Sequence, residues 1–438
     1  MIPLMSDPIF NLIFQEEQRQ KTTLQLIPSE NICSVNVRRA VESILSNKYS
    51  EGYPHKRYYE GNELIDEIEL LAIERAKKIF GVPHANVQPY SGSPANVAIQ
   101  LAILEKNDCM MGMKLSSGGH LTHGHPQITF AGKMFQTIQY GLNAEARIDL
   151  DEVRRLAHEH RPKLMIIGTT AYPFQLPFKE FFEIAQEIGA YVLADISHVS
   201  GLVIGGVHPS PVEFAHIIMT TTHKTLRGPR GAMIMVTNRG LEKDPQLAEK
   251  IDKAVFPGVQ GGPHNNVTAG IAVALEEAST IEFEQYAEQV VKNAKRLATA
   301  LLTRDVKLVG NGTENHLMIL DFSHFGGGTQ VAYAMACAGL YANKNTVPNE
   351  PNSPFYPSGV RIGTPHMTSI GLVEHDMEKV ADWIVRVVRV AERYVLPTEK
   401  TERSPFLKKM REEMKADFDL QMIRAEIALF LKEKSVWK

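Results

Sequence analysis

The sequence is poor in cysteine, and long apolar runs are absent from it. Its 438 residues include three cysteines, Cys33, Cys109 and Cys337, which lie far apart. An odd number of widely spaced cysteines argues against a disulfide framework, so we expect a reducing compartment. No stretch approaches the roughly 18 to 20 apolar residues that span a bilayer. Because Asp7 interrupts the apolar start and Arg19 is the first basic residue, we expect no secretory signal and predict a cytoplasmic protein.

An excess of charge of either sign is also missing. Lys and Arg number 47 against 50 Asp and Glu, which gives a net charge of −3 and argues against a nucleic-acid partner. No G-x-G-x-x-G follows a predicted strand and no G-x-x-x-x-G-K-[ST] occurs, so dinucleotide and P-loop sites lose their main support. The 44% hydrophobic and 22% charged residues are typical of a globular protein.

The middle of the chain alternates helix-like and strand-like segments. Residues 64–80 carry apolar side chains at helical spacing, whereas several short segments are apolar throughout. Buried strands that alternate with helices predict a mostly parallel α/β sheet. The predicted strands of this kind are 164–168, 191–194, 216–219 and 232–236.

A long helical pattern at 279–302 leads out of this region. After it we expect strands at 306–322 and 359–363 and an amphipathic helix at 374–395, then a charge-rich helical extension with a linker at 397–405. The predicted domains are an N-terminal arm, 1–22, a large domain, 23–280, and a small C-terminal domain with the extension, 281–438.

Lys224 lies among hydroxyl side chains in the segment 220–230, between two predicted strands. Desolvation and cationic neighbours lower the pKa of a lysine, which makes Lys224 a candidate Schiff-base nucleophile. Taken alone, the segment fits better a loop lysine that pairs with a phosphate or a carboxylate.

Asp195 directly follows the predicted strand 191–194, and His198 follows Asp195 three residues later. Open α/β sheets bind ligands at the carboxyl ends of their strands, and a carboxylate there suits the protonated ring nitrogen of pyridoxal phosphate. An aspartate at a helix N-cap is the alternative. Because Asp195 and Lys224 lie on neighbouring strand ends, the pair favours the cofactor.

Small residues precede a predicted helix at Ser91-Gly92-Ser93, with Pro94 at its first position. The open N–H groups of such a helix end suit a phosphate, although an ordinary cap is the commoner explanation. Histidines cluster in the glycine-rich segment 118–125, yet no carboxylate or cysteine lies nearby to complete a metal site. We therefore expect no metal and assign His120 to lie flat on a cofactor ring, with a structural histidine as the alternative.

Polar and aromatic residues are dense at Ser29-Glu30-Asn31 and at 49–59. They suit either a general acid/base site or a polar dimer interface. Arg361 lies on a predicted strand, where a guanidinium needs a bidentate carboxylate partner.

These blocks, taken in order from about residue 20 to 395, resemble serine hydroxymethyltransferases. The matching blocks are LIPSEN (26–31), NKYSEGYPHKRYY (47–59), NVQPYSGSPAN (86–96), GGHLTHG (118–124), ADISHVSGLV (194–203), TTTHKTLRGPRG (220–231), FPGVQGGP (256–263), NKNTVPN (343–349) and SGVRIGTP (358–365).

The resemblance implies an α/β fold of the fold-type I pyridoxal-phosphate transferases, with a large domain built on a mostly parallel mixed sheet and a smaller C-terminal α/β domain. It implies pyridoxal 5'-phosphate as cofactor, tetrahydrofolate or a related reduced pterin as co-substrate, and serine and glycine as substrates. It also implies a homodimer, or a tetramer, with sites shared between chains, and neither a nucleic-acid nor a membrane partner.

The resemblance also implies roles for single residues. Lys224 would bind the cofactor covalently, Asp195 would pair with its ring nitrogen and His120 would stack on the ring. Arg361 and Ser29 would bind the amino-acid carboxylate. Further cofactor contacts would come from Thr170 and His198 at the ring hydroxyl, from Ser91, Gly92, Ser93 and His223 at the phosphate, and from Tyr49, Gly261 and Gly262 of the neighbouring chain. Glu51 and Tyr59 of the neighbour would handle the serine hydroxyl, with Tyr49 and His198 near the substrate, and the folate site would include Tyr58, Leu115, Gly119, Leu121 and Asn345.

Four positions depart from the family pattern, Glu60, Ser117, His366 and Ile370. Ser117 lies beside the implied pterin pocket, so these departures leave open a pterin-independent aldolase or transaldolase acting on β-hydroxy amino acids. A non-catalytic binding protein with the same fold is a further alternative, against which the intact Lys224, Asp195 and Arg361 argue.

Overall fold

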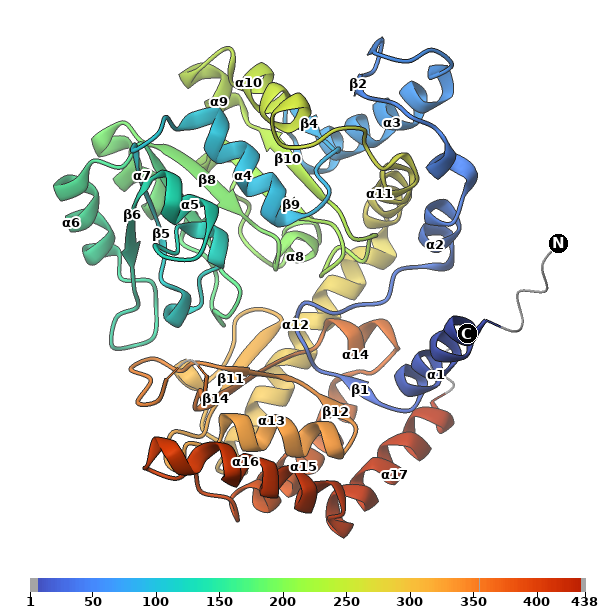
Figure 1. Cartoon of the computed structure of the whole chain (residues 1–438), viewed down its shortest axis with the longest axis vertical. Helices are drawn as coiled ribbons and strands as arrows, with labels where there is room; N and C mark the ends of the chain where they lie inside the picture. Colours follow the sequence, from blue (N-terminus) through green and yellow to red (C-terminus); the bar gives the residue numbers. More distant parts are fainter. Residues whose placement is uncertain (1–6, 354, 435–438) are drawn as a thin grey trace. The chain divides into compact units, whose positions relative to one another are not determined.

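The computed structural model describes residues 7–353 and 355–434, and the chain divides into two compact units (Figure 1). One unit comprises Asn31–Val291, and the other joins the N-terminal segment up to Glu30 to the chain from Lys292 onward. Helix α12 (Ile281–Leu302) carries the chain from the first unit into the second. The domain boundaries expected from the sequence, at residues 22 and 280, remain a prediction.

A seven-stranded mixed sheet forms the centre of the first unit, in the order β4-β10-β9-β8-β7-β5-β6. Strands β6, β5, β7, β8 and β9 are mutually parallel, whereas β10 runs antiparallel to both β9 and β4. The strands are β4 (His84–Asn86), β5 (Cys109–Met113), β6 (Gln136–Tyr140), β7 (Leu164–Gly168), β8 (Tyr191–Asp195), β9 (Ile217–Thr221) and β10 (Ala232–Val236).

The central strands form where the sequence is apolar on both faces. Every residue of β7, β9 and β10 is buried, as expected for strands covered by helices on both sides. Helix α4 (Gly92–Ile103) lies across one face of the sheet (Figure 1), and its Ala95 and Ile99 share a core cluster with Ile166 and Ile217. The predicted strands and the predicted α/β class are thus confirmed.

The other helices of this unit surround the sheet or precede it. A short hairpin of β2 (Gly52–Tyr53) and β3 (Lys56–Arg57) forms a separate two-stranded sheet, and Asn86 of β4 donates a hydrogen bond to its Tyr53 hydroxyl. The helices are α2 (Val35–Val41), α3 (Glu63–Phe80), α5 (Phe130–Met134), α6 (Leu150–His160), α7 (Phe178–Ile188), α8 (Ser200–Ile204), α9 (Asn238–Lys243), α10 (Leu247–Lys253) and α11 (Asn265–Ala278), and short 3-10 helices include Ile44–Asn47, Leu115–Ser117 and Leu121–His123.

The second unit is built on a three-stranded antiparallel sheet in the order β11-β14-β13. A short parallel pair joins β1 to β12 near the N-terminal helix. The elements are α1 (Pro8–Lys21), β1 (Leu24–Gln25), β11 (Leu317–Asp321), α13 (Gly328–Cys337), β12 (Leu340–Tyr341), β13 (Asn343–Asn345), β14 (Gly359–Gly363), α14 (Pro365–Ser369), α15 (Glu374–Ala391), α16 (Lys400–Lys415) and α17 (Phe418–Glu433).

Two predicted segments of this unit are shorter in the structure than the sequence suggests. The predicted strand 306–322 is a strand only over Leu317–Asp321, because Gly310 and Gly312 adopt positive φ and turn the chain before it. The predicted linker 397–405 is shorter, since α16 begins at Lys400 and includes Pro405.

Candidate active site

Asp195 ends β8 and is 7% exposed. Its carboxylate accepts hydrogen bonds from His123 Nε2 at 2.8 Å, from Asn96 Nδ2 at 3.1 Å and from the Ser197 amide at 3.1 Å. Burial by itself raises the pKa of a carboxyl group, but the hydrogen bonds and charges of His123, Ser197 and Lys224 outweigh it and hold the pKa of Asp195 well below its usual value. The buried carboxyl group therefore stays ionised.

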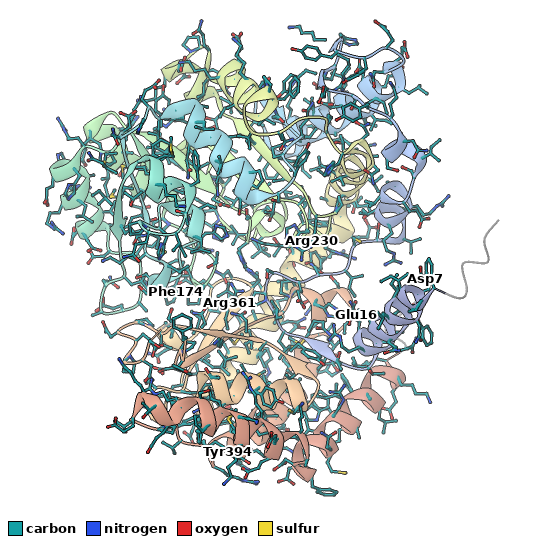
Figure 2. All side chains as sticks on the ribbon, in the orientation of Figure 1. Asp7, Glu16, Phe174, Arg230, Arg361 and Tyr394 are labelled. Carbon is teal, nitrogen blue, oxygen red and sulfur yellow. The ribbon has the colours of Figure 1, made fainter. Side chains whose placement is uncertain are left out.

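Lys224 lies in the loop between β9 and β10, three residues beyond Thr221 at the end of β9. Figure 2 labels Arg230, which lies in the same loop. Two backbone hydrogen bonds close this loop. Gly228 N donates to Thr222 O at 2.7 Å, and Arg227 N donates to Lys224 O at 3.2 Å. Since β8 and β9 are adjacent parallel strands, the sheet brings the Lys224 loop beside Asp195, as the sequence predicts.

His120 lies in a loop whose backbone leaves no room for larger residues beside it. A Cβ on Gly118 would lie 2.4 Å from Ala171 O, and one on Gly119 would lie 2.1 Å from Met113 O. Burial, together with the charges of His123 and Lys224, lowers the pKa of His120 to about 4. Its imidazole is therefore neutral near pH 7, which suits a ring that stacks on another.

Thr170 and His198, two further predicted site residues, lie beside the His120 loop and the Lys224 loop. Thr170 donates its hydroxyl to Gly119 O at 3.0 Å. His198 is buried, and its carbonyl accepts the hydroxyl of Thr225 at 3.0 Å. Thr170 thus lies beside the His120 loop, and His198 beside the Lys224 loop.

The segment Ser91-Gly92-Ser93 begins α4 beside the end of β9. A Cβ on Gly92 would lie 2.8 Å from Thr221 Cγ2, so the glycine permits this close approach. Ser91 is the N-cap of α4, so Pro94 is the third residue of the helix and not, as the sequence predicts, the first. Burial and the charges of Lys224 and Arg230 lower the pKa of His223 to about 3.

Two buried polar side-chain atoms near the end of β9 have no hydrogen-bond partner in the described part of the chain and indicate where a ligand binds. Thr221 Oγ1 and His223 Nδ1 are buried and make no hydrogen bond within the described residues. A buried polar atom without a partner costs free energy, so these atoms call for a polar ligand. With the N–H groups at the start of α4, they suit a phosphate, while Asp195 and His120 suit a protonated pyridine ring. The residues present therefore fit pyridoxal phosphate.

A second cluster gathers around the β2–β3 hairpin. The Tyr49 and Tyr59 rings meet edge to face at 5.2 Å, and a Cβ on Gly261 would lie 3.2 Å from Glu51 Oε1. The Glu51 charge raises the pKa of Tyr59. An open pocket of about 510 Å³ is lined by Glu51, Tyr58 and the segment 256–261. The members that the sequence assigns to the neighbouring chain, Tyr49, Glu51, Tyr59, Gly261 and Gly262, thus lie together.

The residues that the resemblance assigns to folate binding lie in several separate segments of the chain. Leu115 and Leu121 are exposed apolar side chains on the 3-10 helices that flank Gly119. Tyr58 is 74% exposed and packs edge to face on Phe256. Asn345 lies on β13 in the other unit.

Arg361 lies on β14, the central strand of the three-stranded sheet (Figure 2). Its Nε donates to Asn343 Oδ1 at 3.0 Å, and burial lowers its pKa to about 10, so the guanidinium stays charged at neutral pH. Ser29 belongs to the same unit, in the segment that follows β1.

Sequence reasoning missed the residues that hold Asp195. The sequence pattern marks His123 only as one of three clustered histidines, and it assigns no role to Asn96 or Ser197. Their position in the matching blocks GGHLTHG, NVQPYSGSPAN and ADISHVSGLV was the available signal. Hydrogen bonds between segments this far apart in the chain require the fold.

The described residues hold neither a metal-binding cluster nor a membrane-spanning helix. They contain no group of three or more His, Cys, Asp or Glu side chains placed to hold a metal ion. No helix in that part of the chain combines the length and hydropathy that a membrane span needs.

Comparison with known proteins agrees with the geometry. The family model described as serine hydroxymethyltransferase matches residues 4–384. A serine hydroxymethyltransferase of Acidothermus cellulolyticus is 55% identical over 385 residues, 87% of this chain and 88% of that protein. Those of Desulfotalea psychrophila and Sorangium cellulosum are 53% and 52% identical over 384 and 386 residues, each covering 87% of this chain and 88% and 89% of the relative. This chain therefore belongs to the serine hydroxymethyltransferase family.

Proposed function

We propose that this chain catalyses the reversible transfer of the hydroxymethyl group of serine to tetrahydrofolate, which gives glycine and 5,10-methylenetetrahydrofolate. The family has the fold-type I fold, uses pyridoxal phosphate and tetrahydrofolate, and takes serine and glycine as substrates. The observation that carries the proposal is the buried, ionised Asp195, fixed by His123 at 2.8 Å and lying beside the Lys224 loop.

The residues around Asp195 hold the cofactor. Pyridoxal phosphate, when bound, supplies a ring that accepts the electron pair released as the Cα–Cβ bond of serine breaks. Lys224 binds it covalently, and the ionised Asp195 keeps a proton on its ring nitrogen. The neutral His120 would lie against the ring face. Thr170 and His198 approach the ring hydroxyl, and Ser91, Gly92, Ser93 and His223 bind the phosphate at the start of α4.

Arg361 binds the carboxylate of the amino acid, with help from Ser29. A guanidinium forms two parallel hydrogen bonds to a carboxylate, so Arg361 would fix the orientation of the bound amino acid. Glu51 accepts the proton of the serine hydroxyl, while Tyr59, whose phenol pKa the Glu51 charge raises, stays protonated. Tyr49 and His198 complete the amino-acid site.

We propose a homodimer in which each chain lends its Glu51 cluster to the site of the other. Tyr49, Tyr58 and Tyr59 are 59%, 74% and 45% exposed, which leaves them open to a second chain. Gly261 and Gly262 belong to the same cluster and reach the neighbour's phosphate. Tyr58, Leu115, Gly119, Leu121 and Asn345 bind the folate. All three cysteines are free thiols, which supports the cytoplasm as the compartment.

The absorbance spectrum of the purified protein with glycine, recorded before and after adding tetrahydrofolate, tests the function. A long-wavelength band that grows with the folate supports the transferase. A spectrum that changes with glycine and ignores the folate, together with folate-independent cleavage of threonine, would instead identify a pterin-independent aldolase. A protein that takes up no pyridoxal phosphate would contradict both.

A further inference from the structure

The backbone carbonyl of Lys224 is held by a side chain from far away in the sequence. Asn31 Nδ2 donates to Lys224 O at 2.9 Å, although the two residues are 193 positions apart. The same amide nitrogen donates to the Tyr286 hydroxyl at 2.7 Å, so it bonds to both. Asn31 Oδ1 accepts the Ile32 amide at 2.9 Å, which fixes the orientation of the side-chain amide.

Contacts of Tyr286 and Arg227 connect the Asn31 segment to the far end of the same turn. The Arg227 guanidinium lies 4.9 Å from the centroid of the Tyr286 ring, a cation–π contact. Arg227 Nε donates to Ile32 O at 3.4 Å, and Arg227 N donates to Lys224 O at 3.2 Å. Both ends of the turn that begins at Lys224 are therefore tied to the segment that carries Asn31.

The turn itself is not relaxed. Arg227 adopts a φ of 63°, a left-handed conformation that an arginine rarely takes. Such a conformation is unfavourable for a residue with a side chain and persists only where surrounding contacts impose it. The contacts of Arg227 with Ile32 and Tyr286, together with the hydrogen bond from Asn31 to Lys224 O, hold both ends of this turn.

We propose that Asn31 is a positioning residue for Lys224, which holds the lysine backbone in place while its amine leaves and rejoins the cofactor. The proposal rests on the proposed covalent attachment of the cofactor to Lys224. During turnover the substrate amine replaces the Lys224 amine, so the side chain must move and later return. A fixed carbonyl keeps the starting point of the side chain constant, and the amine therefore returns to the same place.

The variant Asn31→Asp tests this role, because it keeps the size of the side chain and removes both donated hydrogen bonds. We expect the rate at which glycine displaces Lys224, followed by stopped-flow absorbance, to fall about tenfold, and kcat to fall with it, while KM for serine changes less than about twofold. We expect the dissociation constant of pyridoxal phosphate, measured by dialysis on the apoprotein, to rise about tenfold. Tyr286→Phe keeps the ring against Arg227 and removes one hydroxyl, so its effects should have the same direction and be smaller.

Asn293 offers a matched control in the other unit. Its side-chain amide likewise donates to one hydroxyl, that of Thr368 at 2.9 Å, and to one backbone carbonyl, that of Leu372 at 2.8 Å. Asn293→Asp therefore measures the general cost of losing such an amide, and we expect it to lower the midpoint of urea unfolding without slowing the displacement of Lys224.

Borohydride reduction followed by peptide mass analysis separates the two possible failures. If the reduced wild-type protein carries no cofactor on Lys224, the proposed function fails. If Lys224 is modified but Asn31→Asp and Tyr286→Phe match Asn293→Asp in displacement rate and cofactor affinity, the positioning role of Asn31 is overturned. Slower displacement in the Asn31 and Tyr286 variants alone supports it.

Discussion

Asp195 combines deep burial with a permanent charge. Burial opposes ionisation, and His123, Ser197 and the nearby Lys224 more than compensate for it. His123 is itself 1% exposed and hydrogen-bonds to Asp195 at 2.8 Å, so the carboxylate has a partner where water has little access. A carboxylate prepared in this way can keep a ring nitrogen protonated throughout the reaction.

Replacing Asp195 with asparagine tests this charge. Asp195→Asn keeps the shape of the side chain but cannot stabilise a positive ring nitrogen, so we expect kcat for serine cleavage to fall roughly a hundredfold or more. Steady-state kinetics with serine and tetrahydrofolate measure the loss. Asp244→Asn, at an ion pair with Lys250 outside the proposed site, serves as the control and should leave kcat unchanged. An Asp195→Asn enzyme with wild-type kcat would refute the assigned role.

Among the elements, the β2–β3 hairpin depends on one buried arginine. Arg57 bonds to Asp66 at 2.8 Å and to Glu69 at 2.6 Å, and its Nη1 donates to the carbonyls of Ser50 and Gly52 at 2.9 and 2.8 Å. These carbonyls lie on either side of Glu51. The arginine therefore holds the segment that presents Glu51.

We expect Arg57→Lys to destabilise the protein by about 3 kcal/mol, because a lysine cannot serve two carboxylates and two carbonyls and leaves buried charge unpaired. Urea unfolding measures the change. Arg155→Lys, at an exposed pair with Glu159, should cost less than about 1 kcal/mol. Equal losses in the two variants would show that Arg57 is an ordinary ion pair.

Buried histidines make the stability of the whole molecule depend on pH. Burial lowers the pKa of His120, His216 and His366 to about 4, and that of His223 to about 3. In the unfolded chain these groups bind protons near pH 6.5, whereas in the folded chain they do not. The unfolded state therefore gains more protons as the pH falls.

We accordingly expect the apoprotein to lose stability from about pH 6.5 down to about pH 4, with each histidine contributing about 1 to 3 kcal/mol. Urea unfolding at a series of pH values checks the slope. His216 lies outside the proposed site, where its Nδ1 accepts the Val192 amide at 2.9 Å. His216→Gln should reduce the slope, and a stability independent of pH in this range would contradict the assignment.

The shared sites of the proposed dimer predict complementation between two inactive chains. Lys224→Ala and Glu51→Gln each disable a different part of the site, so a mixed dimer holds one intact site and one with both defects. Random mixing makes half of the dimers mixed, and the expected kcat per chain is about a quarter of the wild-type value. Serine cleavage by the co-refolded mixture measures it. Activity no higher than that of either variant alone would exclude sites completed by the neighbouring chain.

The sequence by itself determined the family, the α/β class and the strands β7 to β10. Its apolar runs are buried on both faces of the sheet, and its motifs keep their order along the chain, so local pattern was enough. The tertiary structure decided what surrounds each motif. The antiparallel pairing of β10 with β4 joins distant parts of the chain. The bond between His123 and Asp195 and the bond from Asn31 to Lys224 join residues 72 and 193 positions apart. Their contacts depend on the packing of the whole sheet, which no local pattern records.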